Sequence, residues 1–345
     1  MLGTGTVGTA FVERYGRLIE DGAALPRFEV LANSRGTGVC GDDPARALRA
    51  VAGLPRATRL ARTVAFDITG LASGDIVVDA TASDAIAGQH AAWLHAGLHV
   101  VTANKLGNGA DLTRALAIVR AQRDTGARYG DSATVGAGLP LLRSLRELVA
   151  GGDRIHGVEG VLSGSLAWLF DHFDGMRPFS GFVREAVTAG YTEPDPRIDL
   201  SGEDVRRKLL ILARAAGLEL QADGIEVESL VPASLAGVPV ARLDARLPAF
   251  DASLRARYQQ AYRNGAKLRF VGRFEVGANG CRASVGLRAL PAEHPLCGGG
   301  GTDNRVAIHS CRYRQQPLVI QGPGAGADVT AAALLDDVLR AMREP

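Results

Sequence analysis

The chain has 345 residues, enough for two domains with separate cores, and its 46% hydrophobic and 22% charged residues are typical of globular proteins. The formal charge of +2 argues against a nucleic-acid partner. No apolar run is long enough to span a bilayer, no secretory signal is present, and the four cysteines lack metal-ligand spacing. These features predict a cytoplasmic protein that binds neither membrane nor nucleic acid.

The first ten residues, MLGTGTVGTA, contain the spacing G-x-G-x-x-G at Gly3, Gly5 and Gly8. In dinucleotide-binding folds this turn follows a β-strand and opens a helix whose N-terminus faces the cofactor pyrophosphate. A helix is expected over 9–20, but only Met1 and Leu2 precede the glycines. We therefore expect a shortened form of the protein, with the first strand reduced to a stub and cofactor binding weakened.

A β-α-β pattern follows the glycine turn. Strands are expected at 28–32, 75–80 and 98–102, a helix at 84–96, and a loop with a helix over 39–62. Apolar runs alternating with helices favour a doubly wound, Rossmann-type parallel sheet. Ligands bind beyond the carboxyl ends of such strands, so the glycine turn, Thr81–Ser83 and Lys105 should meet in one crevice.

The pattern changes near residues 130–140. Pro140 should open a helix that continues to Leu148, followed by a strand over 154–164, a helix over 165–173, mixed strands at 267–274 and 281–287, and a glycine turn that leads into a helix within 320–342. We expect a dinucleotide-binding domain at 1–135, completed by 322–345, and a second α+β domain at 136–321.

Lysine is rare in this chain, since only Lys105, Lys208 and Lys267 accompany 36 arginines. A lysine can release a proton where an arginine stays charged. Lys105 follows an expected buried strand, which favours a ligand role over a surface-loop role, whereas Lys267 has no acidic or glycine-rich context and is expected to be structural.

Lys208 lies in the densest polar segment of the chain. The two prolines at 194 and 196 predict an extended path over 193–197, and Ser201 is expected to cap a helix over 203–216. Asp204 and Lys208 are four residues apart and share a helix face, which is consistent with a proton donor held by a carboxylate. The alternative is a solvated surface pair worth ~0.3 kcal/mol.

Six segments in order resemble homoserine dehydrogenases, especially the dehydrogenase portion of bifunctional aspartokinase–homoserine dehydrogenases: GTGTVG, VVTANK, TVGAGLP, VLSGS, GYTEPDPRIDLSGEDVRRKLLILAR and GPGAGADVTAA. The resemblance implies an NAD(P)H-dependent oxidoreductase that reduces L-aspartate 4-semialdehyde to L-homoserine in threonine and methionine biosynthesis. It also implies a homodimer paired through the second domain.

The resemblance assigns roles to single residues. Lys208 matches the general acid that protonates the aldehyde oxygen, and Lys105 matches the lysine beside nicotinamide and substrate. Glu193 and Asp204 match substrate-binding acids, and Asp199 matches a nearby carboxylate. The resemblance, the glycine turn and the strand ends together give the positions expected to contact the cofactor. These are Gly3, Gly5, Thr6, Val7, Gly8, Arg35, Thr81, Ser83, Lys105 and Gly326.

Two features of the site stay open. No acid follows the strand at 28–32, and Arg35 suits the 2′-phosphate of NADP, so NADP is favoured while NAD remains possible. Relatives hold a monovalent cation such as sodium on backbone carbonyls that match Val135, Ala137 and Leu139. Their glutamate three residues before that valine is Ser132 here; Asp131 could replace it, or the cation site could be weak or absent.

Two alternative functions are open at the level of the sequence. An aspartate semialdehyde dehydrogenase needs a nucleophilic cysteine, and none of the four lies in a convincing context. An N-terminally truncated, weakly active or silent relative that binds substrate or nucleotide is the remaining alternative. We expect neither an aspartokinase region nor a regulatory module in this polypeptide.

Overall fold

The computed structural model describes residues 1–40, 43–53 and 70–343. It divides into two compact units, Met1–Gly138 with Ala325–Pro345, and Leu139–Gly324. Within the expected loop and helix over 39–62, helix α2 covers Pro44–Ala52, and residues 54–62 lie outside the described residues. In the described part of the chain no helix has both the length and the apolarity required to cross a bilayer.

Parallel pairing defines the sheet of the first unit. Strand β4 (His99–Thr102) lies between β3 (Ile76–Asp79) and β5 (Tyr129–Gly130), and β1 (Val30–Asn33) forms a hairpin with β2 (Gly36–Val39). Val77, Val78, Val100 and Val101 are buried, as expected for strands covered on both faces. The predicted Rossmann-type architecture is confirmed.

Leu2 joins the two parts of this sheet. It forms parallel bridges to Ala32 of β1 and to Asp79 of β3. Its backbone N–H donates to Val78 and its carbonyl accepts from Ala80, both at 2.8 Å. The strand position before the glycine turn is therefore represented by this short segment, between β1 and β3.

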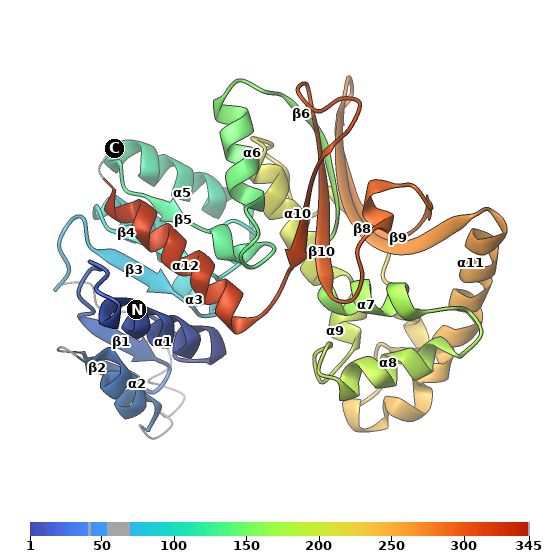
Figure 1. Ribbon diagram of the computed structural model, residues 1–345, viewed down its shortest axis with the longest axis horizontal. Helices are drawn as coiled ribbons and strands as arrows, with labels where there is room; N and C mark the ends of the chain where they lie inside the picture. The colour runs from blue at the N-terminus through green and yellow to red at the C-terminus, as the bar shows by residue number, and fades with distance from the viewer. Residues whose placement is uncertain (41–42, 54–69, 344–345) are drawn as a thin grey trace. The chain divides into compact units, whose positions relative to one another are not determined.

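Helices cover both faces of the first sheet (Figure 1). Helices α1 (Thr6–Glu20) and α12 (Ala327–Met342) pack against each other over one apolar cluster. Helices α4 (His90–His95) and α5 (Leu112–Thr125) pack together beside the other cluster. This two-sided burial leaves the strand ends as the place for ligands.

The prediction of one continuous helix over 84–96 is wrong. The segment forms two helices, α3 (Asp84–Ala87) and α4, because the first turn ends at Gly88. Gly88 donates its N–H to Asp84 and Gln89 donates to Ile86, which closes the turn before α4 begins. Glycine weakens helix continuation because it has more backbone freedom to lose.

The second unit is built on a six-stranded sheet in the order β11-β10-β6-β8-β9-β7. Every neighbouring pair is antiparallel except β7 and β9. The strands are β6 (Ile155–Val161), β7 (Ile225–Val227), β8 (Ala266–Gly277), β9 (Gly280–Pro291), β10 (Asp303–Ser310) and β11 (Leu318–Pro323). Part of the glycine turn expected before the last helix is therefore strand.

Helices of the second unit pack on this sheet. Phe270 and Val285 lie within 3.3 Å of the Cβ position of Gly202, which precedes helix α10 (Glu203–Ala215). Val205 and Leu209 of this helix lie against Gly272 of β8. The helices of this unit are α6 (Leu141–Ala150), α7 (Gly164–His172), α8 (Phe179–Thr188), α9 (Arg197–Leu200), α10 (Glu203–Ala215) and α11 (Asp251–Arg263). Figure 1 shows α6 and α10 along one face of the sheet.

Candidate functional site

The glycine turn has the geometry of a dinucleotide-binding loop. Gly3 has φ of +92°, and a Cβ there would lie 2.7 Å from the carbonyl oxygen of Ala80. A Cβ on Gly8 would lie 2.1 Å from the carbonyl oxygen of Gly3, so a side chain fits at neither position. Gly5 faces open space at the N-terminus of α1, where Thr6 and Val7 form the first turn. Free backbone N–H groups at a helix start suit an anionic pyrophosphate.

The ends of β3 and β4 meet beside this turn. The Cγ2 of Thr81 lies 3.1 Å from the Cβ position of Gly3, and the Nδ2 of Asn104 donates to Thr81 Oγ1 at 3.3 Å and to the Ser83 carbonyl at 2.9 Å. Ser83 also caps α3 through its hydroxyl. Lys105 follows Asn104 directly, so the structure brings together the three segments expected at this edge.

A buried polar network behind this edge was missed in the sequence. The carboxylate of Asp79 accepts from His90 Nε2 at 2.9 Å and from Asn104 Nδ2 at 3.0 Å, and His90 Nδ1 lies 3.0 Å from Tyr129 Oη. Asp79 and His90 are fully buried. The available signals were an acid ending an apolar strand and a histidine on the same helix face as Trp93. The network holds Asn104, and with it the backbone leading to Lys105.

Arg35 lies in the turn between β1 and β2. Its backbone N–H donates to Asn33 Oδ1 at 2.7 Å, and its guanidinium donates to the carbonyl of Ala52 at the end of α2. Arg35 is exposed, so its charge is accessible from solvent. Asn33 also donates to Thr4 Oγ1 at 2.8 Å, which connects this turn to the glycine turn.

The loop after β5 contains the residues expected to hold a cation. Ala137 has φ of +51°, the one positive φ among the described non-glycine residues, and follows Gly136 at +73°. Val135 and Ala137 belong to the first unit, whereas Leu139 begins the second. Among the described residues no cluster of three His, Cys, Asp or Glu side chains could hold a metal ion. Gly326 caps α12 at the other end of the first unit.

Ser132 and Asp131 have partners of their own. The N–H and hydroxyl of Ser132 donate to the two carboxylate oxygens of Asp337 on α12, at 2.8 and 2.9 Å. Asn108 donates to Asp131 at 2.7 Å. The Asp337 carboxylate of α12 therefore contacts Ser132, the position at which relatives are expected to carry glutamate. Arg340 pairs with the same carboxylate at 2.7 Å.

Lys208 is held by two oxygen atoms in the second unit. Its Nζ donates to the carbonyl of Leu162 at 2.7 Å and lies 2.9 Å from Asp204 Oδ2, one turn earlier on α10. Lys208 is 8% exposed, so the pair is not the solvated surface pair considered as the alternative. Since an ammonium group carries three N–H donors, one is left for a substrate oxygen.

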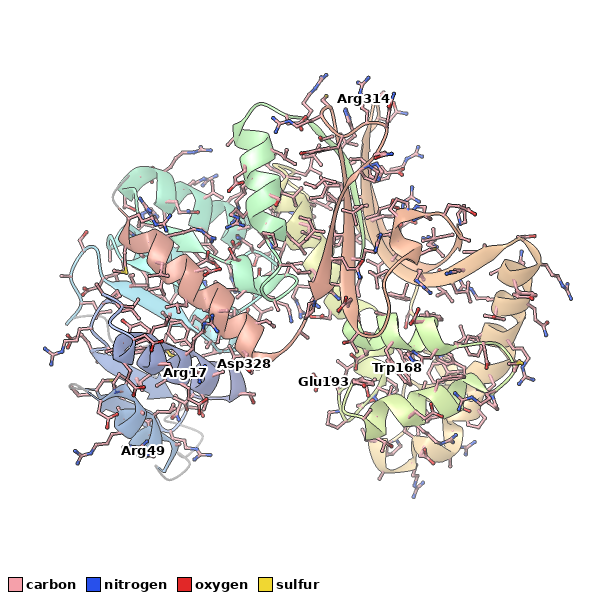
Figure 2. All side chains as sticks on the ribbon, viewed as in Figure 1. Arg17, Arg49, Trp168, Glu193, Arg314 and Asp328 are labelled. Carbon is pink, nitrogen blue, oxygen red and sulfur yellow. The ribbon has the colours of Figure 1, made fainter. Side chains whose placement is uncertain are left out.

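Asp199 organises the segment next to Lys208. One carboxylate oxygen accepts from Ser165 Oγ at 2.7 Å and the other accepts from the backbone N–H of Glu193 at 2.9 Å. Ser165 in turn lies 2.9 Å from Ser163 Oγ, which caps α7. Glu193 is exposed on the loop between α8 and α9 (Figure 2). Asp199 thus fixes this loop against the start of α7.

Two local expectations around α10 were wrong. The helix cap is Gly202, with φ of +80°, and Ser201 instead ends α9 while its hydroxyl accepts from Glu203 at 3.2 Å. A Cβ on Gly202 would lie 2.9 Å from Phe270, so tertiary packing requires glycine here. The extended path expected over 193–197 ends earlier, because Pro196 has a helical ψ of −13° and α9 begins at Arg197.

Arg197 anchors the segment from the other side. It donates to Asp195 through Nε and Nη2 and to the carbonyls of Leu235 and Val238 at 2.6 and 2.7 Å. The Arg197 guanidinium, by hydrogen bonding, holds the pKa of the Asp195 carboxyl below its ordinary value. The acidic loop is therefore held at both ends, by Asp199 and by Arg197.

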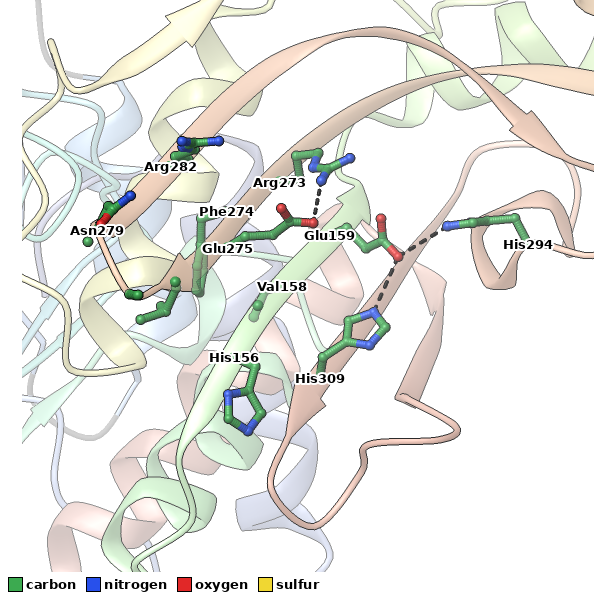
Figure 3. Close-up of a pocket in the computed structure, with 15 residues that line it drawn as sticks. His156, Val158, Glu159, Arg273, Phe274, Glu275, Asn279, Arg282, His294 and His309 are labelled. Atoms are coloured by element: carbon green, nitrogen blue, oxygen red, sulfur yellow. Dashed lines mark hydrogen bonds and ion pairs between the residues drawn. The ribbon is translucent and has the colours of Figure 1, made fainter.

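A cavity of about 660 Å³ lies elsewhere on the second unit (Figure 3). It opens on the polar face of the sheet and contains none of the predicted site residues. Glu159 lies at its centre, with Nε2 of His294 and Nε2 of His309 each 3.3 Å from its Oε1. Arg273 pairs with Glu275 nearby. We therefore place the candidate chemistry at Lys208 and not in this cavity.

Three of the four cysteines, Cys40, Cys281 and Cys297, are poor candidates for a thiolate nucleophile. Burial raises the pKa of the thiols of Cys40, Cys281 and Cys297. A raised pKa keeps a thiol protonated at neutral pH, whereas a catalytic cysteine needs a lowered one. This observation argues against the alternative dehydrogenase that forms a thioester.

The comparisons with known proteins agree with this geometry. Residues 3–130 match the family model described as the NAD-binding domain of homoserine dehydrogenase, and residues 140–339 match the model for homoserine dehydrogenase itself. The fold and the first match define the chain as an NAD(P)-dependent oxidoreductase. The second match covers more than half of the chain: the protein belongs to the homoserine dehydrogenase family.

Individual relatives show the same family. The chain is 37% identical to a homoserine dehydrogenase of Emericella nidulans, with 99% of this chain and 96% of that one covered. It is 44% identical to a bifunctional aspartokinase/homoserine dehydrogenase of Zea mays over 77% of this chain, and spans 29% of that longer relative. A crystal structure of a Candida auris protein of unknown function has a TM-score of 0.85 at 33% identity, covering 99% and 96%.

Proposed function

We propose that this chain catalyses the NADPH-dependent reduction of L-aspartate 4-semialdehyde to L-homoserine, a step toward threonine and methionine, with Lys208 as the general acid. The observation that carries the proposal is the Lys208 ammonium, buried and aimed by Leu162 and Asp204. Family membership supplies the reaction class, and the first unit supplies the cofactor fold. In the reverse direction Lys208 accepts the hydroxyl proton.

A bound nicotinamide cofactor supplies the hydride in this reaction. Negative charge then develops on the aldehyde oxygen, and an adjacent ammonium stabilises this charge and donates a proton. The Oδ2 atom of Asp204, 2.9 Å from the Lys208 Nζ, holds this ammonium group in position. Lys105 is proposed to contact nicotinamide and substrate from the first unit.

The substrate carries an ammonium group, which needs carboxylate partners. Glu193 is exposed on its loop and Asp204 is half-buried, so both offer oxygens to this cation. Both oxygens of Asp199 are already engaged with Ser165 and Glu193. We therefore propose Glu193 and Asp204 as binding residues and Asp199 as the residue that positions the loop.

The cofactor contacts follow the geometry of the first unit. The glycine turn takes the pyrophosphate, Arg35 takes the 2′-phosphate of NADP, and the loop after β3 takes the nucleoside near the nicotinamide end. These contacts divide the chain into a cofactor domain, close to 1–135 with 322–345, and a catalytic and dimerisation domain, close to 136–321. Residues proposed to contact the cofactor are Gly3, Gly5, Thr6, Val7, Gly8, Arg35, Thr81, Ser83, Lys105 and Gly326.

Three finer features belong to the same proposal. A monovalent cation such as sodium would use the carbonyls of Val135, Ala137 and Leu139, and the left-handed backbone at Ala137 supports a specialised loop there. A homodimer would pair through the second unit. The cytoplasmic location stays a prediction.

The substitution Lys208→Arg tests the proposal. Arginine keeps the positive charge but does not release a proton at neutral pH, so homoserine-dependent reduction of NADP should fall ~10²–10⁴-fold. Far-ultraviolet circular dichroism and the melting temperature should stay close to wild type. Lys267→Arg is the matched control, because Lys267 is exposed on β8 and should tolerate the change.

Substantial turnover by the Lys208→Arg enzyme would overturn this assignment. A wild-type chain that binds NADP but shows no homoserine-dependent reduction would favour the silent binding protein instead. Nucleotide binding followed by protein fluorescence separates these outcomes, because it does not require catalysis.

A further inference from the structure

Asn304 has a buried side-chain amide for which the described residues provide no hydrogen-bond partner. It lies in β10 at 0% exposure, and neither Nδ2 nor Oδ1 is bonded to any residue that the structure describes. Buried polar atoms are nearly always satisfied, since an unpaired one loses its hydration without compensation. An amide with both a donor and an acceptor unpaired needs an explanation, and a bound ligand is one group that would satisfy both atoms.

The backbone of β11 fixes this amide. Asn304 is paired in register with Gly322, and a Cβ on Gly324 would lie 2.0 Å from both Cγ and Oδ1 of Asn304. Only a glycine at 324 leaves room for the amide in this place. Its donor and acceptor are thus held in a defined orientation before any ligand binds.

The same register brings Asn304 beside the Lys208 site. Arg305 pairs with Val161, so Asn304 lies next to the following residue, Leu162, whose carbonyl accepts from Lys208. The carbonyl of Thr302 lies 3.0 Å from the Cβ position of Gly164, which places the approach to β10 against the start of α7. All these residues belong to the unit Leu139–Gly324.

We propose that Asn304 binds the α-amino-acid end of the substrate, with Nδ2 donating to the carboxylate and Oδ1 accepting from the ammonium. This inference rests on the proposed function. An amino-acid zwitterion presents one acceptor and one donor on neighbouring atoms, which is the complement of an amide side chain. Glu193 and Asp204 can bind only the ammonium, so Asn304 supplies the donor that the carboxylate needs.

The test compares two alcohol substrates. L-homoserine carries the carboxylate, and 3-amino-1-propanol is the same alcohol without it. In Asn304→Ala, kcat/KM for L-homoserine should fall roughly 10- to 100-fold, with a much smaller change for 3-amino-1-propanol. Asn304→Asp keeps the shape of the side chain but removes the donor and adds a negative charge. Its preference in kcat/KM for L-homoserine over 3-amino-1-propanol should be smaller than that of Asn304→Ala. The KM for NADP should not change, and Asn279→Ala, at an exposed hairpin position, serves as the control.

A second variant probes the orientation of the amide. Gly324→Ala adds a methyl group where the amide lies, so it should lower kcat/KM for L-homoserine in the same way as Asn304→Ala. The double variant should be no worse than the single ones, because both remove one interaction.

Two results would overturn the role of Asn304. One is an equal loss of kcat/KM for the two alcohols, and the other is a changed KM for NADP with an unchanged KM for L-homoserine. The thermal shift induced by L-homoserine provides a readout without turnover. An inactive wild type whose thermal shift is abolished by Asn304→Ala would contradict the proposed function and leave this assignment standing. Equal thermal shifts in wild type and variant would contradict the assignment itself.

Discussion

Arg35 lies on a turn whose two ends are tied to different parts of the first unit. Its guanidinium contacts Ala52 and its backbone is bonded to Asn33, which in turn contacts Thr4 of the glycine turn. This connection places a positive charge at the end of β1, where a 2′-phosphate would lie in a dinucleotide-binding sheet. Under the proposed function, cofactor choice depends on this one exposed side chain, whose backbone is held by Asn33.

Arg35→Ala should raise the KM for NADP roughly 10-fold and leave the KM for NAD nearly unchanged, because only NADP carries the phosphate that the guanidinium binds. Arg49→Ala is the control: Arg49 is exposed on α2 (Figure 2) and bears the same charge. Parallel changes in the two KM values would show that Arg35 stabilises the turn and does not select the cofactor.

At the scale of elements, α12 is tied to the loop after β5 by one buried acid. Asp337 accepts both hydrogen bonds from Ser132, and a Cβ on Gly130 would lie 2.6 Å from the Asp337 Cβ. Burial raises the pKa of the Asp337 carboxyl, and the charge of Asp131 adds to this effect, while Ser132 and Arg340 oppose it. The element that closes the first unit thus contains a titratable contact.

This contact predicts a pH dependence of stability. The native carboxyl binds a proton more tightly than the unfolded one, so the free energy of unfolding falls as pH rises from about 3.9 through the raised pKa, and is flat above it. Asp337→Asn should lack this slope in urea denaturation measured from about pH 4 to about pH 8. Asp336→Asn, at the exposed neighbouring position, should keep it, and identical slopes in all three proteins would contradict the prediction.

At the scale of the whole molecule, the second unit presents a sheet face that the described helices leave open around Glu159. This face bears Arg273, Glu275, Arg282 and His309 and is hollowed by the cavity in Figure 3. A sheet face that carries both acids and bases suits a two-fold dimer, because the acids of one copy can face the bases of the other. It is the surface through which we propose that the homodimer forms.

Light scattering should therefore give a species of twice 36.1 kDa for the wild-type chain. Arg273→Glu adds an acid beside Glu159 and Glu275 and should shift the protein toward monomer, because repulsion is repeated in each copy. Arg255→Glu changes the same charge at an exposed position of α11 and should stay dimeric. A dimer unaffected by Arg273→Glu would place the interface elsewhere.

Local patterns predicted most elements of both units. Apolar runs identified β3 and β4, and the four-residue spacing of Asp204 and Lys208 predicted a pair that the structure contains at 2.9 Å. One of the errors falls where a distant residue decides a local conformation. Gly202 replaces Ser201 as the cap of α10 because Phe270 occupies the space that a Cβ would need.

The sequence by itself determined the cofactor fold, the lysine and its acidic partner, and the order of the family's motifs, because periodicity and fixed spacing are local properties of the chain. Only the tertiary structure decided that Lys208 is buried against Leu162, that the two carboxylate oxygens of Asp199 bond to Ser165 and Glu193, and that the amide of Asn304 has no partner among the described residues. These facts depend on register between strands and on helix packing, where residues far apart in sequence come within bonding distance.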